Sequence, residues 1–453
     1  MNDQDDINTK INFGSDAFKK YFANTSWMFA EKFIRLGIAF IVGIYVVRYL
    51  GPENFGLISY AISFVGLFAT ISTLGLDSIV VRELVKDPSR RDELLGSVFY
   101  LRIIGAIIAV FLTIITAFIL QESYFNILLI TIIVTSTIFQ SLNVVEYYFQ
   151  ARVESKFNVF VQSSSLIISS IVKALLVLFN ASLIYFAIVY VIEFILLSVG
   201  YYLVYKINNL KISGWKFKST TAINLVKDAW PLILSGVVIA VYMKIDQVMI
   251  KIILNTKEVG FYAAAVKLSE AWYFIPMAIC TSLFPAIINA KQINETIYLN
   301  RMQKLYDMLS VISIVIAVIV TFLSEFIITI IFGVKYLPSA SVLTIYIWAG
   351  VPVFLGVATS QYLINENLTR LAFYRTFIGM IINVILNIFL IPVYGINGAA
   401  VATLISYSLS VLAIGFFKNT RQQLRFMFYS VLGINILKFI LREINDKTKK
   451  NYS

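Results

Sequence analysis

Long apolar runs recur along the whole chain and constrain its fold more than any other feature. A helix needs about 20 mostly apolar residues to cross a bilayer, and the chain offers twelve such runs between charged residues or Pro, Gly and Asn breaks. The chain is 59% hydrophobic and only 14% charged, whereas soluble domains are about 45–50% apolar and about 25% charged. The sequence therefore predicts an all-α integral membrane protein, with spans at 23–47, 55–76, 98–120, 124–148, 159–179, 182–205, 229–253, 259–289, 305–332, 339–364, 371–391 and 396–417.

The basic residues predict the orientation of these spans. With the N-terminus in the cytoplasm, 25 of the 37 Lys and Arg residues fall in the N-terminal segment, the inner connections and the tail. The outer loops then hold only Arg48, Lys257 and Lys335. Because cytoplasmic loops carry an excess of Lys and Arg, we expect both termini to be cytoplasmic. The net charge of +12 is then mostly loop charge and implies no nucleic-acid partner.

The spans divide into two sets of six. The segments LGPENFGLISYAISF, from Leu50, and LNTKEVGFYAAAVKL, from Leu254, agree at three positions 204 residues apart, including Gly56 and Gly260. Six helices per half keep both halves in one orientation, so we expect parallel repeats around a central cavity. The predicted parts are a cytoplasmic N-terminal segment without a cleavable signal peptide (1–22), an N-lobe (23–205), an inter-lobe connection (206–228), a C-lobe (229–417) and a basic cytoplasmic tail with an interfacial helix (418–453).

Charged residues inside the predicted spans are the candidates for a functional site. A charge near the bilayer centre is costly unless it faces a polar interior. Lys244 lies about 22 Å along its helix from Trp230, and Asp246 points about 200° away from Lys244, so Asp246 needs a partner on another helix. Lys251 shares the face of Lys244 but lies near the outer end, where it can snorkel. Helical spacing and depth suggest three further acid–base pairs: Glu31–Arg35, Lys267–Glu270 and Lys173–Glu193.

Several segments, in order along the chain, resemble those of one known family. They are RYLGPENFGLISYA (48–61), KIDQVMI (244–250), VGFYAAAVKLSEAWYFIP (259–276), IFGVKYLPSA (331–340) and IPVYGINGAAVAT (391–403). Together they are similar to bacterial polysaccharide (O-antigen-type) flippases of the multidrug/oligosaccharidyl-lipid/polysaccharide exporter superfamily. The resemblance covers about 20–417.

The resemblance implies both a fold and a function. Such proteins have twelve helices in two six-helix lobes around a central cavity. They move an undecaprenyl-pyrophosphate-linked oligosaccharide from the cytoplasmic to the periplasmic leaflet by alternating access, with ion coupling. The expected place is the bacterial inner membrane, and the expected partners are the lipid-linked substrate, the phospholipid membrane, and a polymerase and glycosyltransferases of lipopolysaccharide biosynthesis.

The charged residues of the spans suit such a cargo, because a pyrophosphate needs cations in a low-dielectric space. The candidates for substrate binding in the cationic cavity are Arg35, Lys244, Lys32, Lys267, Lys173, Arg102 and Lys251. The candidates for ion coupling are Asp246, Glu270, Glu193 and Glu325. A structural or gating role is predicted for Glu31, Asp77 and Arg82.

Other classes of function fit the sequence less well. An enzyme acting on lipid-linked sugars would need sizeable outer loops, and the chain has no histidine, no metal-ligand cluster and no phosphate-binding glycine loop. We therefore expect no enzyme activity, no metal and no cofactor. A multidrug or cation antiporter of the same superfamily would favour an acidic cavity, whereas the deep charges here include more bases than acids. This antiporter stays an alternative, as does a flippase for a capsule, exopolysaccharide or peptidoglycan precursor. A membrane scaffold would not need so many buried ions.

Overall fold

The computed structural model describes the backbone of residues 15–434 and the side chains from Arg35 onward, except those at positions 36 and 419. Within this part of the chain the secondary structure is helical throughout, with short connections and no strand. The chain folds into two compact units. Unit 1 comprises the residues up to Val46 together with Phe68–Gly236, and unit 2 comprises Val47–Leu67 and the residues from Val237 onward. The segment Val47–Leu67, which the predicted lobe boundaries assign to the N-lobe, thus groups with unit 2.

Two helices are each long enough to supply two membrane spans. α1 (Ser15–Thr73) breaks at Gly51 with a φ of 67°, and α15 (Thr369–Leu412) breaks at Gly395 with a φ of 60°. Glycine adopts positive φ without a steric penalty, and a proline near each break removes a backbone donor. Ten helical stretches in the described chain are long and apolar enough to cross a membrane. Because two of these are of double length, they cover the twelve predicted segments, and the predicted all-α membrane fold is confirmed.

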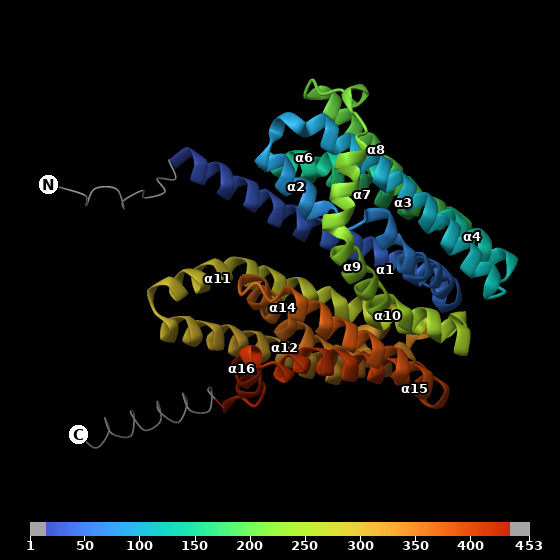
Figure 1. The fold of residues 1–453 in the computed structure, drawn as a ribbon. Helices are drawn as coiled ribbons and strands as arrows, with labels where there is room; N and C mark the ends of the chain where they lie inside the picture. Colours follow the sequence, from blue (N-terminus) through green and yellow to red (C-terminus); the bar gives the residue numbers. More distant parts are fainter. Residues whose placement is uncertain (1–14, 435–453) are drawn as a thin grey trace, which may run out of the picture. The chain divides into compact units, whose positions relative to one another are not determined.

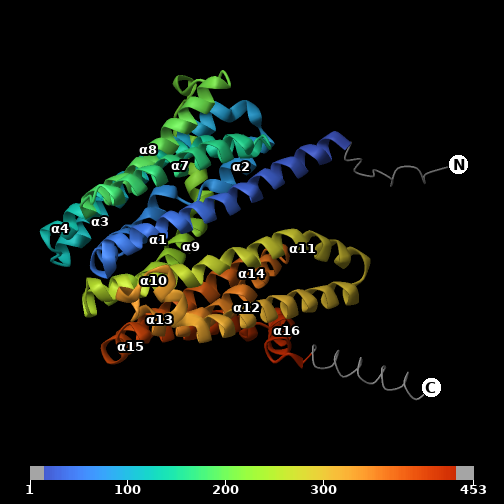
Figure 2. The same ribbon diagram turned by 180° about the vertical axis from the view of Figure 1, so that it is seen from behind.

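Unit 1 is a bundle whose long helices pack along one another. α7 and α8 run side by side, as both ribbon views show (Figures 1 and 2). Its core is apolar and aromatic, and it joins Leu76 and Val80 to Phe149 and Tyr205. Polar caps begin some of its helices; for example, Ser123 Oγ accepts from the backbone of Asn126 at 3.3 Å. The helices of unit 1 after α1 are α2 (Asp77–Lys86), α3 (Arg91–Ile119), α4 (Tyr124–Val134), α5 (Ser136–Phe139), α6 (Val144–Ala151), α7 (Lys156–Leu178) and α8 (Leu183–Ile207), and α9 (Ser219–Ile253) continues into unit 2.

Unit 2 is a second bundle; apart from Val47–Leu67, which belongs to the blue α1, its described part is coloured from yellow-green to red in Figure 1. α11 and α12 form a long antiparallel hairpin, visible from both sides (Figures 1 and 2). Its core includes Phe284, Met302, Tyr306 and Phe354, all nearly inaccessible to solvent. Besides α15, its helices are α10 (Thr256–Glu270), α11 (Phe274–Ile293), α12 (Glu295–Ile331), α13 (Ser339–Tyr346), α14 (Gly350–Asn365) and α16 (Arg421–Val431).

The two segments that match in sequence 204 residues apart cross each other inside unit 2. A Cβ atom built on Gly56 would lie 1.8 Å from the backbone oxygen of Thr256, and one built on Gly260 would lie 1.8 Å from the backbone oxygen of Pro52. Thr256 is itself 204 residues after Pro52, so the contact is reciprocal. Only residues without a Cβ allow such a close approach of two helices.

The tail contains a helix that packs against the rest of unit 2. In α16, Ser430 Oγ donates to Asp307 of α12 at 2.7 Å, and Met427 is buried in the core of unit 2. The first part of the predicted interfacial segment is thus helical, and the part after residue 434 lies outside the described residues.

Candidate functional site

Asp246 is the most completely buried of the predicted site residues in unit 2. It lies on α9 with 5% of its surface exposed. Tyr262 on α10 donates to its carboxylate at 2.7 Å, and Asn387 and Thr403, both on α15, donate at 2.6 Å each. The partners therefore come from other helices, as the direction of Asp246 on its own helix requires. Three neutral donors stabilise a carboxylate at this depth.

Further amides and hydroxyls extend the hydrogen-bond network around this carboxylate. Asn387 also donates to Asn383 Oδ1 at 3.2 Å, and Asn383 donates to Ser406 at 3.4 Å. The Oδ1 atom of Asn387 is buried without a hydrogen-bond partner among the described residues. A negative charge balanced only by neutral dipoles can accept a proton or a small cation, because its charge is stabilised but not cancelled.

Lys244 and Lys251, two of the predicted bases of unit 2, have different neighbours. The aliphatic stem of Lys244 passes Gly66, where a built Cβ would contact its Cγ at 3.5 Å. Lys244 also interacts electrostatically with Glu270, which accepts a long hydrogen bond of 3.4 Å from Tyr346. The ammonium of Lys251 lies 5.2 Å from the ring centroid of Tyr60, a cation–π distance.

The other predicted site residues of unit 2 are Lys267 and Glu325. Lys267 is partly buried on α10, and Glu325 is exposed on α12.

Arg35 enters a polar cavity of about 210 Å³ in unit 1. Its Nη1 donates to Gln162 at 2.9 Å. Gln162 donates in turn to Glu146 at 3.2 Å and to Tyr201 at 3.1 Å, and the Tyr201 hydroxyl donates to the other oxygen of Glu146 at 3.1 Å. Glu193 lines the same cavity. The cavity thus carries both signs of charge, linked by neutral groups.

Lys173 and Glu193 form the expected ion pair between α7 and α8. Their charged atoms are 2.8 Å apart, and each side chain is only about a quarter exposed. Ser169 donates to the same carboxylate oxygen at 3.0 Å. Lys173 is therefore already neutralised in this arrangement.

Arg102 and Asp77 belong to one buried network in unit 1. Arg102 is 3% exposed and donates to the hydroxyl of Tyr147 at 2.7 Å. That hydroxyl donates to Asp77. Arg82 is more exposed and pairs with Glu83 at 3.0 Å and Asp228 at 3.5 Å. The side chains of Glu31 and Lys32 lie outside the described residues.

Two features of these sites were not predicted from the sequence. Glu146 lines the cavity of Arg35. Its position as a carboxylate inside the predicted span 124–148 is a sequence signal that could have identified it. Asn383 and Asn387 lie one helical turn apart on α15, and such i,i+4 polar spacing inside an apolar run is a readable signal. The described residues contain no group of three or more Cys, Asp or Glu side chains arranged to hold a metal ion.

Comparison with known protein families identifies the family of this chain. The family model described as "Polysaccharide biosynthesis protein" matches residues 21–291, which is more than half of the chain. The chain belongs to this family. The resemblance read from the sequence motifs is thereby confirmed at the level of the family, and the protein is a multi-pass membrane protein.

Curated relatives in this group come from archaea. A probable low-salt glycan biosynthesis flippase of Haloferax volcanii, Agl15, is 28% identical over 42% of this chain and 41% of its own length. A second probable flippase of that organism, AglR, is 28% identical over 48% of this chain and 46% of its own length. The matches thus span less than half of either relative. An uncharacterised membrane protein of Methanocaldococcus jannaschii, MJ1375, is 23% identical over 85% of this chain and 94% of its own length.

Solved structures agree on the fold. The lipid II flippase MurJ in an inward closed conformation superposes with a TM-score of 0.69 at 17% identity, covering 91% of this chain and 92% of that one. An inward-facing multidrug resistance transporter of the MATE family gives a TM-score of 0.62 at 13% identity, covering 89% and 95%. At these identities the likeness concerns the fold alone, and it supports the predicted two-lobe, twelve-helix class.

Proposed function

We propose that the protein is a flippase that moves a lipid-linked oligosaccharide across the membrane by alternating access. The observation that carries this proposal is the family match over residues 21–291. The cargo is an undecaprenyl-pyrophosphate-linked repeat unit of O-antigen type, moved from the cytoplasmic to the periplasmic leaflet of a bacterial inner membrane. A polymerase and glycosyltransferases of the same pathway are the partners that would consume and supply it.

Deep cations support an anionic cargo. Arg35 in unit 1 lies in a polar cavity and Lys244 in unit 2 lies partly buried on a membrane-spanning helix. Arginine and lysine at such depth bind phosphate through charge-assisted hydrogen bonds that are stronger than in water. Among the predicted bases, we assign Arg35 and Lys244 as phosphate ligands of their respective units. The other predicted bases have weaker claims, because Lys173 is paired with a carboxylate and Arg102 is enclosed in a buried network.

Asp246 is the candidate for ion coupling. A buried carboxylate stabilised by Tyr262, Asn387 and Thr403 can exchange a proton or a small cation without unfolding its surroundings. Its donors come from α10 and α15, so a change in the charge of Asp246 would alter the packing of three helices. This gives a physical route from an ion gradient to movement of the unit.

Gene deletion tests the proposed function in cells. Loss of the protein should abolish the surface polysaccharide and should leave the lipid-linked repeat unit on the cytoplasmic side. Expression of Arg35→Ala or Lys244→Ala should not restore the polysaccharide, whereas Lys335→Ala, at an exposed position outside the long helices, should restore it. Continued delivery of the repeat unit in a strain lacking related flippases would refute the proposal.

A further inference from the structure

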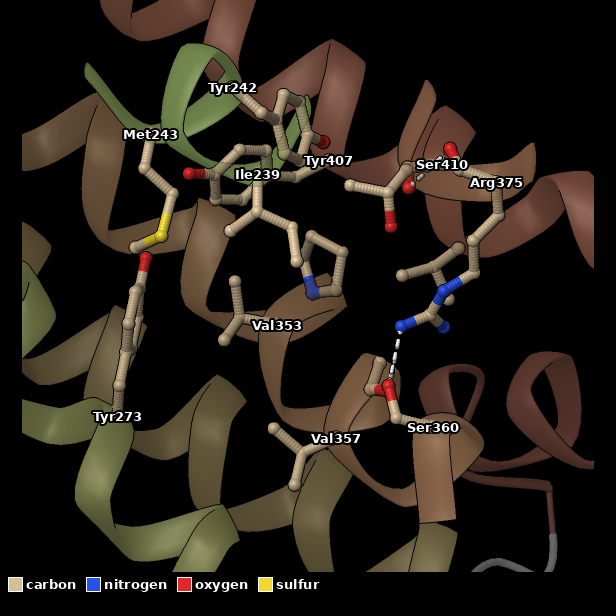
Figure 3. A pocket seen from close by; sticks show the side chains of 14 residues that line it. Ile239, Tyr242, Met243, Tyr273, Val353, Val357, Ser360, Arg375, Tyr407 and Ser410 are labelled. Atoms are coloured by element: carbon tan, nitrogen blue, oxygen red, sulfur yellow. Dashed lines mark hydrogen bonds between the residues drawn. The ribbon is translucent and has the colours of Figure 1, made fainter. Parts of the chain in front are cut away.

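Unit 2 contains a cavity of about 220 Å³ that is distinct from the surroundings of Asp246. Figure 3 shows its lining, which comes from α9, α14, α15 and the short turn Ala271–Tyr273. The rings of Tyr242 and Tyr407 pack together on one side, with centroids 4.7 Å apart. Arg375 and Ser360 lie on another side (Figure 3).

Arg375 is the charged residue of this cavity, and its guanidinium is only partly satisfied. Its Nη2 donates to Ser360 Oγ at 2.7 Å and to the backbone oxygen of Gly356 at 3.2 Å. The Nε and Nη1 atoms are buried and have no hydrogen-bond partner among the described residues. No carboxylate is among the described residues that line the cavity. A buried cation without a counter-charge is costly, and a buried donor without an acceptor requires an explanation.

The remainder of the wall is apolar or aromatic. Val353 and Val357 of α14 face the cavity opposite the tyrosines (Figure 3). Ile239 and Met243 of α9 also line it, with 46% and 41% of their surfaces exposed. These two residues therefore make an apolar rim. A free inorganic anion would gain nothing from such walls, whereas an apolar chain would bury surface against them.

We propose that this cavity binds a phosphate ester carried on an apolar chain. The phosphate accepts hydrogen bonds from the unpartnered Nε and Nη1 of Arg375, and the chain leaves along the rim formed by Ile239 and Met243. Guanidinium groups suit phosphate oxygens through charge and planar donor geometry. Under the proposed function, on which this identification of the source rests, the natural occupant is the lipid phosphate of the cargo. A membrane phospholipid carries the same chemistry and is the second source to be tested.

Native mass spectrometry of the purified full chain tests this site. The probes are undecaprenyl phosphate and phosphatidylglycerol, added separately and in competition. We expect Arg375→Gln to weaken phosphate-lipid binding about 10- to 100-fold, since a hydrogen bond to a charged group is worth about 1.5–3 kcal/mol. The matched control is Arg370→Gln, an exposed arginine five residues earlier on the same helix, which should bind as the wild type does.

A second variant tests the site independently, in case Arg375→Gln does not fold. Val357→Phe keeps the arginine but fills the cavity, so it should also weaken binding of the phosphate lipid. Wild-type binding in both variants, or no binding of either lipid to the wild-type protein, would overturn the proposal. Equally tight binding of inorganic phosphate, measured as a competitor, would overturn the assignment of an apolar chain. Competition between the two lipids identifies the source, and preference for the undecaprenyl phosphate is expected.

The site and the proposed function can fail separately. If the wild-type protein binds the lipid through Arg375 but moves no lipid-linked oligosaccharide, the site stands and the function is wrong. If transport occurs but neither Arg375→Gln nor Val357→Phe changes binding, the function stands and the site is wrong.

Discussion

The reciprocal crossing of Gly56 and Gly260 gives a prediction whose size follows from the structure. A Cβ atom on Gly260 would lie 1.8 Å from the backbone oxygen of Pro52, whereas real Cβ atoms stay beyond 3.0 Å. The atoms that this Cβ would meet belong to the backbone of Pro52 and not to a flexible side chain. The Gly260→Ala substitution must therefore move the two helices apart by more than about 1 Å. Overpacking of this kind costs about 1–3 kcal/mol, and the better helix propensity of alanine returns at most about 1 kcal/mol.

We therefore expect Gly260→Ala to lower the free energy of unfolding by about 1–2 kcal/mol. Gly56→Ala should have a similar effect, since its Cβ would lie 1.8 Å from the backbone oxygen of Thr256. The double variant should cost little more than either single variant, because one separation of the helices relieves both clashes. Thermal unfolding in detergent, followed by tryptophan fluorescence, measures the three variants against the wild-type protein.

Gly350→Ala is the matched control. Gly350 also lies in a helix of unit 2, at the start of α14, but a Cβ built on it meets no atom within 4 Å. It should unfold at the wild-type temperature or slightly above it. If Gly260→Ala unfolded at the same temperature as Gly350→Ala, the two helices would not cross closely at Gly260. The matching segments of the internal repeat would then not form this crossing. Additive losses in the double variant would contradict the reasoning that one movement relieves both clashes.

Three further experiments test the charged networks. Asp246→Asn should keep the protein folded but remove the dependence of transport on a sodium or proton gradient, measured in proteoliposomes; unchanged dependence would exclude Asp246 as the coupling group. The losses of unfolding free energy caused by Lys173→Met and by Glu193→Gln should add up to more than the loss in the double variant. We expect this difference, the coupling energy, to be about 0.5–3 kcal/mol in a thermal-unfolding cycle; zero coupling would contradict the ion pair. Tyr147→Phe should cost about 1–3 kcal/mol of unfolding free energy, because it leaves Asp77 and a buried guanidinium without their shared partner; wild-type stability would argue against that network.

The sequence predicts the helices well because each break has a local cause. Charged residues, prolines and glycines separate the apolar runs, and an asparagine side chain caps the start of α10 and of α12. Asn255 accepts from Glu258 at 3.0 Å, and Asn294 accepts from Thr296 at 2.7 Å. The sequence does not predict that the helices around Gly51 and Gly395 continue through a single distorted residue. That continuity depends on the path of the chain on both sides of the break.

The site is less predictable because its partners come from distant helices. Helical direction shows that Asp246 cannot pair with Lys244, but it does not show that Tyr262, Asn387 and Thr403 supply the donors. Arg375 illustrates the same limit. It is a base within the predicted span 371–391. Only the packing of α9, α14 and α15 distinguishes it from the other bases, because that packing leaves two of its nitrogen atoms without partners among the described residues.

Movement of a lipid-linked oligosaccharide by the purified protein is the most direct test of the central claim. The protein is reconstituted into liposomes that carry a fluorescent undecaprenyl-pyrophosphate-linked oligosaccharide in both leaflets, and a membrane-impermeant reductant is added outside. The account predicts that nearly all of the fluorescence is quenched with the wild-type protein, and that only about half is quenched with Arg35→Ala or Lys244→Ala, as expected for two equally filled leaflets without exchange. Quenching that stops at about half with the wild-type protein would contradict the assignment of a flippase.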